Sequence, residues 1–144
     1  MIKIARAKPS ECQEVRRFEQ FVWKEVCITS PYDIAFFVSY GYVFLAKDND
    51  VIVGAIIAIK TKYDEVKITD WLVDERYRRT GIGSRLYKRL KNDIKGLPII
   101  AYVESKNIAS LAGHEKLGFK RIKQVEDPFY LGDKKSWWIM KSES

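Results

Sequence analysis

The sequence has few of the residues that build metal sites and disulfide frameworks. Its 144 residues include one histidine and two cysteines, Cys12 and Cys27, which form no Cys-x-x-Cys pair. Such sparse cysteines favour reduced thiols in a cytoplasmic protein, with a disulfide as the alternative. Cys12 falls at the start of an expected helix's apolar stripe, which makes it a core residue and not a nucleophile. We therefore expect no metal site.

Long hydrophobic runs are also missing. The longest, Val51–Ile59, is too short to cross a bilayer, and no basic-then-apolar segment opens the sequence as a signal peptide would. Hydrophobic residues nevertheless make up 47% of the chain, which excludes a disordered protein. We expect residues 1–144 to form a single domain with a sizeable core and no membrane partner.

The net charge of +7 is compatible with several anionic partners. Nucleic acid, an anionic surface, an acidic substrate and an anionic cofactor all remain possible on charge alone. No helix-turn-helix, zinc motif or aromatic-basic repeat supports nucleic acid, so that class is the least favoured.

One stretch, Trp71–Leu90, is typical of a strand that turns through glycines into a helix. The apolar strand ends at Val73, and Gly96 and Pro98 stop the helix. The helix stripe recurs every four residues, at Ile82, Leu86, Leu90 and Ile94.

A glycine turn at a helix N-terminus forms an anion site, because free backbone N–H groups and the positive end of the helix dipole point to one place. Arg78 and Arg79 add positive charge there. The dinucleotide fingerprint Gly-x-Gly-x-x-Gly does not fit, since Leu86 occupies its third glycine position. A phosphate-binding loop is therefore favoured over a plain strand-to-helix turn.

The segment from Arg78 to Gly83, Arg-Arg-Thr-Gly-Ile-Gly, resembles the acetyl-CoA loop of the GNAT superfamily of N-acetyltransferases. A second segment, Asn107–Phe119, also resembles that family. The positions that match it in type and spacing are Asn107, Ser110, Glu115, Lys116, Gly118 and Phe119. It departs at His114, where the family usually has tyrosine, and at Gly113, which replaces a common leucine.

The remaining pattern predicts a mixed α/β fold with helices on both faces of one mixed sheet of six to seven strands. The expected order is β-α-α-β-β-β-α-β-α-β-β, which is also the order of the GNAT family. The expected strands are Ile2–Ala7, Tyr42–Lys47, Val51–Lys60, Glu65–Val73, Pro98–Val103, Lys120–Val125 and Ser136–Lys141. Helices are expected from Pro9-Ser10, with Ser10 as a possible cap, from Asp33 to Tyr40, and after Asn107.

The resemblance implies transfer of an acetyl group from acetyl-CoA to an amine by direct attack on the thioester. The implied cofactor-binding residues are Trp71, Val73, Arg78, Arg79, Thr80, Gly81, Ile82, Gly83, Ser84, Asn107 and Ser110. The strands ending at Val73 and Val103 should be parallel neighbours that splay apart, and the Val73 N–H should stabilise the oxyanion.

The acid and the base are where the sequence departs from the family. His114 stands at the tyrosine position, where it can donate a proton or be an ordinary helix residue. Lys67 and Tyr102 occupy the positions where family members place a glutamate. Asp70 and Glu104 are the nearest carboxylates, and each is a candidate base or an ordinary strand carboxylate.

Two classes of function stay open. The first is an acetyltransferase acting on a small molecule or protein amine, as a monomer or homodimer. The second is an acyl-CoA-binding module that regulates a partner without turnover, which the missing tyrosine and glutamate would suit.

Overall fold

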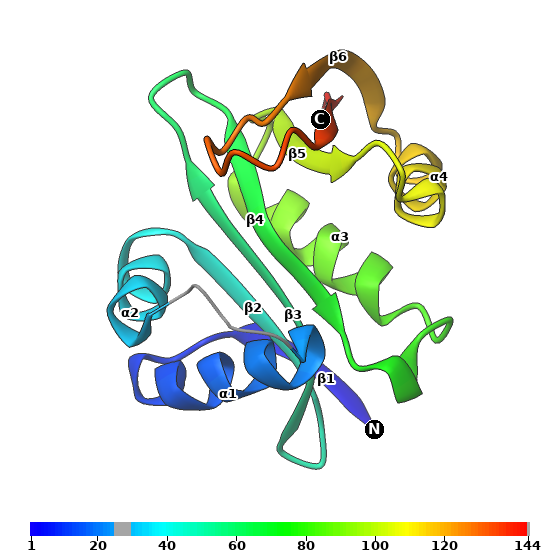
Figure 1. Cartoon of the computed structure of the whole chain (residues 1–144). Coiled ribbons are helices and arrows are strands. Elements are labelled where there is room, and N and C mark those ends of the chain that lie inside the picture. Colours follow the sequence, from blue (N-terminus) through cyan, green and yellow to red (C-terminus); the bar gives the residue numbers. More distant parts are fainter. Residues whose placement is uncertain (25–29, 144) are drawn as a thin grey trace.

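The fold is a seven-stranded mixed sheet with helices on both faces, as described by a computed structural model that covers residues 1–24 and 30–143. Figure 1 shows α1 and α2 together on one side of the sheet and α3 on the other. Over these residues the strands are β1 Ile2–Arg6, β2 Tyr42–Asp48, β3 Val51–Lys60, β4 Val66–Val73, β5 Ile99–Glu104, β6 Lys120–Glu126 and β7 Ser136–Ser142, in the order β1-β2-β3-β4-β5-β7-β6. The helices are α1 Cys12–Trp23, α2 Pro31–Tyr40, α3 Ile82–Ile94 and α4 Ile108–Lys116.

This order of strands and helices confirms the sequence prediction, and most boundaries agree within two residues. The helix α2 begins earlier than expected because Ser30 caps it: the Ser30 hydroxyl accepts from the Asp33 N–H at 3.2 Å, and the Asp33 carboxylate accepts from the Ser30 N–H at 3.0 Å. The expected cap Ser10 is wrong, since it lies inside a 3-10 turn, Pro9–Glu11, that precedes α1. Cys27 lies outside the described residues.

Each face of the sheet has its own apolar core. On the α1 face, Val15 and Phe18 of α1 pack with Ile34 of α2, and the partly buried Cys12 joins them as expected. On the α3 face, Leu86 and Leu90 pack with Leu111 of α4 and residues of the central strands. Several aromatic residues of α1 and α2 lie outside these cores and are more than half exposed: Phe21, Trp23, Tyr32, Phe36 and Tyr40.

Gly54 lies where α3 packs closely on the sheet. A Cβ atom there would lie 2.9 Å from Ile82 Cγ2 and 3.1 Å from Leu86 Cδ1. A β-bulge lies beside it, because the β2–β3 register shifts between Ala46 and Lys47. The missing side chain therefore allows the first turn of α3, and the loop before it, to sit against the strands.

A bulge in β4 decides which way its last side chains point. Ile68 pairs with Ala58 and Asp70 with Ile57, which leaves Thr69 as an extra residue whose hydroxyl donates to the Ile57 carbonyl at 3.2 Å. Strand side chains alternate between faces, so one extra residue reverses the pattern. As a result, Trp71 and Val73 share the α3 face with Val66 and Ile68, whereas Leu72 packs on the α1 face.

The strands β4 and β5 part as predicted. They are parallel, and in the described residues they pair only at Val66 with Ile99 and Lys67 with Ile100. Both strands continue well beyond these pairs, to Val73 and Glu104. The second half of β4 therefore has one edge without a strand partner.

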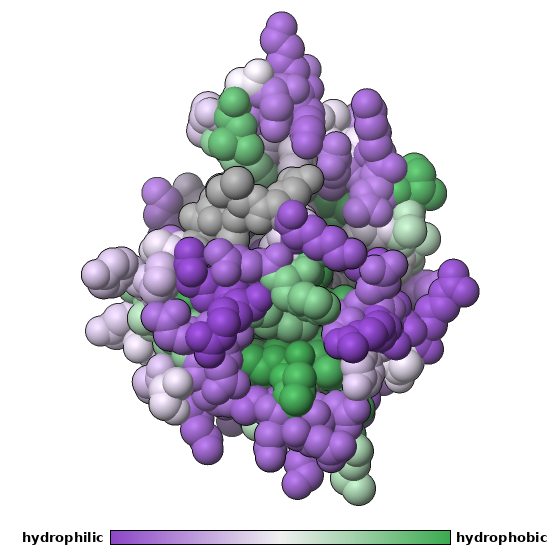
Figure 2. All heavy atoms as spheres, turned by 60° about the horizontal axis from the view of Figure 1, so that its bottom comes forward, coloured by the Kyte–Doolittle hydropathy of each residue, from purple (hydrophilic) through white to green (hydrophobic). Residues whose placement is uncertain are grey.

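One face of the molecule is mostly polar. Figure 2 shows hydrophilic side chains covering most of one face and surrounding a smaller hydrophobic area near its centre. Over residues 1–24 and 30–143, no helix has the length and apolar character needed to span a membrane.

Candidate functional site

A cavity of about 720 Å³ lies along the end of β4, beyond the residues that pair with β5. It brings together eight of the residues that the sequence predicts for the site: Trp71, Val73, Arg78, Arg79, Gly83, Ser84, Ser110 and His114. Residues that sequence reasoning did not assign complete its wall: Val22, Leu72, Ala109, Gly113, Lys116 and Leu117. Residues from α1, β4, α3 and α4 thus line one space.

The glycine loop leaves its backbone donors available. Gly81, at φ 82°, adopts the left-handed conformation that glycine tolerates and occupies the position before α3. It offers no capping side chain, so the first N–H groups of the helix, at Ile82, Gly83 and Ser84, have no side-chain acceptor. These groups and the helix dipole make an anion site at the mouth of the cavity.

Two exposed arginines flank this anion site. Arg78 and Arg79 line the cavity, and neither forms an ion pair with a carboxylate of the described residues. The turn that carries them is braced by the buried Asp74, which accepts from the Arg76 N–H at 3.0 Å and from the Arg76 guanidinium at 2.8 Å. Tyr77 donates to Asp48 at 2.7 Å and ties the same turn to the β2–β3 hairpin.

Three of the predicted loop residues do not present a side chain to the cavity. Ile82 is buried in the α3-face core, so only its N–H can contact a ligand. The Thr80 hydroxyl donates to the Tyr77 carbonyl within the loop. The side chains of Ile82 and Thr80 do not line the cavity, and neither does Gly81.

The open edge of β4 presents hydrogen-bonding groups to the cavity. The Asp74 N–H donates to the Val53 carbonyl of β3 at 2.8 Å. Because successive residues of a strand direct their backbone groups to opposite sides, those of Val73 and Trp71 point away from β3, toward the gap left by β5. Both residues line the cavity, so an extended ligand can pair with this edge as a strand would.

Trp71 ties three elements together at the cavity. Its indole Nε1 donates to the Gly83 carbonyl at 3.1 Å, and its ring stacks on Tyr87 with centroids 5.4 Å apart. The His114 ring contacts Trp71 edge-on at 5.0 Å and Phe119 at 5.1 Å. His114 thus lies on α4, next to the first turn of α3, and the rings of Trp71 and Phe119 pack against it.

The proton of His114 has a defined place. Its Nδ1 lies 2.7 Å from the Ser110 carbonyl, which can only accept, so Nδ1 is the donor and a proton on Nε2 requires the charged imidazolium. Burial lowers the pKa of His114, although the hydrogen bond to Ser110 opposes this. At neutral pH the imidazole is mainly neutral, with a lone pair on Nε2.

Other expectations for α4 are mixed. Asn107 caps the helix as expected, its side chain accepting from the Ser110 N–H at 3.1 Å, but it does not line the cavity. Ile108 and Ala112 are exposed, and in this helix only Leu111 is buried. The helix therefore contacts the rest of the protein mainly through Leu111 and the His114 ring.

The two candidate bases lie on different strands. Asp70 is half-buried on β4, and burial raises its pKa. Its neighbour is Glu19 of α1, which is fully buried and which sequence reasoning missed. Glu104 is half-buried at the end of β5, and neither it nor Asp70 lines the cavity.

Lys67, at the position where some family members have glutamate, contacts aromatic rings on the other side of the crevice. Its ammonium lies 4.0 Å from the centroid of Tyr102 and 5.1 Å from that of Phe129. Burial lowers the pKa of Lys67. Lys67 and Tyr102, which occupy the two positions where family members have glutamate, therefore contact each other directly.

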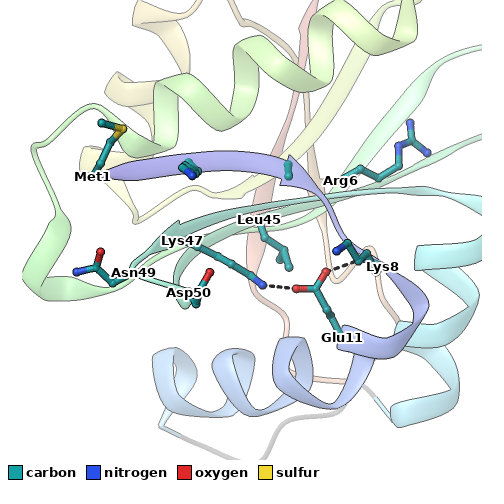
Figure 3. Close-up of a pocket in the computed structure, with 10 residues that line it drawn as sticks. Met1, Arg6, Lys8, Glu11, Leu45, Lys47, Asn49 and Asp50 are labelled. Carbon is teal, nitrogen blue, oxygen red and sulfur yellow. Dashed lines mark hydrogen bonds and ion pairs between the residues drawn. The ribbon is translucent and has the colours of Figure 1, made fainter.

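A second cavity, of about 510 Å³, lies at the β1 edge of the sheet (Figure 3). An ion pair between Lys47 and Glu11 spans it, and Glu11 also accepts from the Lys8 N–H at 2.8 Å. None of the predicted site residues lines this cavity. Its Glu11 carboxylate is already paired with Lys47, so the crevice beside β4 is the stronger candidate.

The fold and the crevice define a class of protein. The chain matches the acetyltransferase (GNAT) family over residues 9–119 and belongs to that family. No curated protein is significantly similar to it in sequence.

Solved structures of acetyltransferases share this fold over nearly the whole chain. The ribosomal-protein-S18-alanine N-acetyltransferase of Escherichia coli is 21% identical, with a TM-score of 0.81 over 99% of this chain and 94% of that one. Naa50 of Arabidopsis thaliana, solved with a bisubstrate analogue, is 19% identical, with a TM-score of 0.80 over 99% of both chains. YncA of Salmonella typhimurium, solved with acetyl-CoA, is 18% identical, with a TM-score of 0.79 over 99% and 93%.

Proposed function

We propose that this protein transfers an acetyl group from acetyl-CoA to a primary amine by direct attack of the amine on the thioester. The observation that carries the proposal is the crevice beside β4, which combines an unpaired strand edge with an anion site at the α3 N-terminus. Family membership and the relatives solved with acetyl-CoA or a CoA-containing analogue support the same cosubstrate.

In this proposal the pyrophosphate of CoA binds at the glycine loop. Arg78 and Arg79 supply charge, and the N–H groups from Ile82 to Ser84 supply hydrogen bonds. The pantetheine arm then extends along the open edge of β4 and pairs with the backbone of Trp71 and Val73. This direction carries the thioester away from the loop and toward the point where the strands part.

The reaction requires three contributions from the protein near the thioester. The Val73 N–H stabilises the oxyanion that forms when the amine attacks. Asp70 or Glu104 takes the proton that the incoming ammonium must lose. The thiolate leaves with a proton from His114 when its imidazole is charged, and otherwise leaves unaided.

A binding experiment tests the cofactor site. Gly83→Asp should fold, because an acidic residue is favoured in the first turn of a helix, but it should lose acetyl-CoA by placing negative charge beside the phosphates. Gly83→Ala is the matched control: its Cβ would lie 3.6 Å from Trp71 Nε1 and 3.7 Å from Val73 Cγ2, which are ordinary contacts. Equal affinities of Gly83→Asp and the wild type in calorimetry would show that the loop is misassigned.

A screen of amines tests the reaction. The readout is release of free CoA, and the panel should include peptide α-amines, lysine side chains, polyamines and small metabolites. Peptide α-amines have priority because one of the similar structures is named for acetylating a protein alanine.

The second candidate function is an acyl-CoA-binding module without turnover. The occupation of the family's glutamate positions by Lys67 and Tyr102, which contact each other, favours it. It predicts tight acetyl-CoA binding together with no CoA release for any amine of the panel.

A further inference from the structure

Glu19 is a buried acid without a donor. It is 0% exposed in the middle of α1, and neither of its carboxyl oxygens accepts a hydrogen bond from a donor group of the described residues. An ionised carboxylate in such a place costs several kcal/mol, so the group is held as the neutral acid. A neutral acid carries an O–H donor, and this donor needs an acceptor.

Asp70 is the acceptor that the fold supplies. The bulge at Thr69 turns Asp70 to the face of β4 on which Leu72 packs, and α1 covers that face. Burial, and then interaction with the Asp70 carboxyl, raises the pKa of Glu19 from 4.5 to about 9, while the charge of Arg16 acts in the opposite direction. Burial and the Asp70 carboxyl thus both favour the protonated form of Glu19.

Among the described residues, the groups that face Glu19 from the neighbouring elements are apolar or engaged elsewhere. Ile34 of α2 and Ile57 of β3, in the core that α1 packs on, are apolar and buried. Lys67 lies on the same face of β4 as Asp70, but its ammonium is engaged with the Tyr102 ring at 4.0 Å. Arg16 is the charged neighbour from α1 itself.

The pair lies next to the cavity. Val22, three residues after Glu19 and so on the same side of α1, lines the cavity, and so does Leu72, two residues after Asp70 on the same face of β4. The two acids therefore lie beside residues that line the cavity, although they do not line it themselves. They stand on the α1 side of the open strand edge, opposite His114 and the glycine loop.

We propose that Glu19 is a positioning residue: it keeps its proton, donates it as a hydrogen bond to Asp70, and so holds the Asp70 carboxylate ready to accept the proton of the acceptor's ammonium. This inference rests on the proposed acetyltransferase function. It selects Asp70 over Glu104 as the base, because the described structure gives only Asp70 an acidic partner of this kind.

The proton balance is simple. The ammonium of the acceptor gives one proton to the Asp70 carboxylate, which becomes a neutral acid, while Glu19 remains protonated. The neutral amine then forms the new C–N bond to the acetyl carbon, and the C–S bond breaks as CoA thiolate leaves. The proton released from the amide nitrogen neutralises the thiolate, and Asp70 returns its own proton to solvent before the next turnover.

The test compares two variants of similar volume. Glu19→Gln keeps a donor toward Asp70, whereas Glu19→Met removes it. The readout is the pH profile of kcat/KM for an amine found in the screen, with acetyl-CoA affinity measured in parallel. A hydrogen bond to a carboxylate lowers its pKa, so Glu19→Met should move the acid limb of the profile to higher pH by about one unit, and Glu19→Gln should leave it near the wild-type position.

Asp70→Asn should lower kcat by about 10²–10⁴-fold with acetyl-CoA affinity unchanged. An acid limb that Glu19→Met leaves in place, or that both Glu19 variants move equally, would overturn the positioning role. Full activity of Asp70→Asn would overturn the choice of base.

A spectroscopic measurement separates this inference from the proposed function. At neutral pH the infrared spectrum of the wild type should contain the carbonyl band of one buried protonated carboxylic acid, and Glu19→Gln should lose it. If the band is present but no amine is acetylated, the protonated state of Glu19 stands and the acetyltransferase proposal fails. If the band is absent, Glu19 is ionised and the inference fails whatever the turnover.

Discussion

The buried acid Glu19 should make the stability of this protein fall as the pH rises. In the unfolded chain a glutamate loses its proton near pH 4.5, whereas in the folded protein Glu19 keeps it to about pH 9. Between these values the folded state binds more protons than the unfolded state, so the free energy of unfolding decreases with pH. The effect is absent below pH 4.5 and complete above pH 9.

Its size follows from the gap between the unfolded pKa and the working pH. Each unit of that gap costs about 1.4 kcal/mol, so at pH 7 the penalty is about 3 kcal/mol. Glutamine has no proton to lose, and Glu19→Gln should therefore gain about 3 kcal/mol relative to the wild type between pH 4 and pH 7. A constant offset of about 1 kcal/mol from the buried amide does not alter this difference in slope.

Urea unfolding at several pH values between 4 and 8 measures the difference. The wild-type and Glu19→Gln curves should diverge as the pH rises, with the variant becoming relatively more stable. Parallel curves would mean that Glu19 ionises normally in the folded state, which would refute the argument from its burial. Asp70→Asn serves as a control, because it removes the partner but leaves Glu19 in place.

Three further predictions concern the cavity and its support. Proton donation from His114 to the leaving thiolate needs the charged imidazole, so this contribution should be present below the lowered pKa of His114 and should fade as the pH rises. His114→Ala should lower kcat by much less than 10⁴-fold, the upper end of the usual range of about 10²–10⁴-fold, and His114→Tyr should keep most of the activity. Identical kcat profiles for the wild type and His114→Ala would show that the residue has no role in catalysis. Trp71→Phe removes the hydrogen bond to the Gly83 carbonyl and should lower the free energy of unfolding by about 1 kcal/mol, with weaker acetyl-CoA binding; unchanged binding would show that this bond does not support the loop. Gly54→Ala places a methyl group against Ile82 and should cost about 1–3 kcal/mol in chemical denaturation, and a stability equal to the wild type would mean that α3 can move away at no cost.

The sequence alone determined the features that depend on neighbouring residues. The stripe of α3, the glycines before it and the stop at Gly96 lie in one continuous segment, and the structure confirms the helix and its boundaries. The same holds for the β2–β3 hairpin, where Asn49 and Asp50 both adopt left-handed backbone at φ 48° and 68°, as a tight two-residue turn requires. Local backbone preferences and periodicity are sufficient for such elements.

Only the tertiary structure decided which side chains meet. The bulge at Thr69 reverses the direction of every later side chain in β4, and nothing in the local pattern indicates that one residue is extra. Glu19 looked like an ordinary polar residue of an amphipathic helix, yet it is fully buried, and its pKa is raised first by this burial and then by Asp70 from a distant part of the chain. A residue's position along a helix or strand is local information, whereas the partner of a buried charge depends on how α1 packs on the sheet.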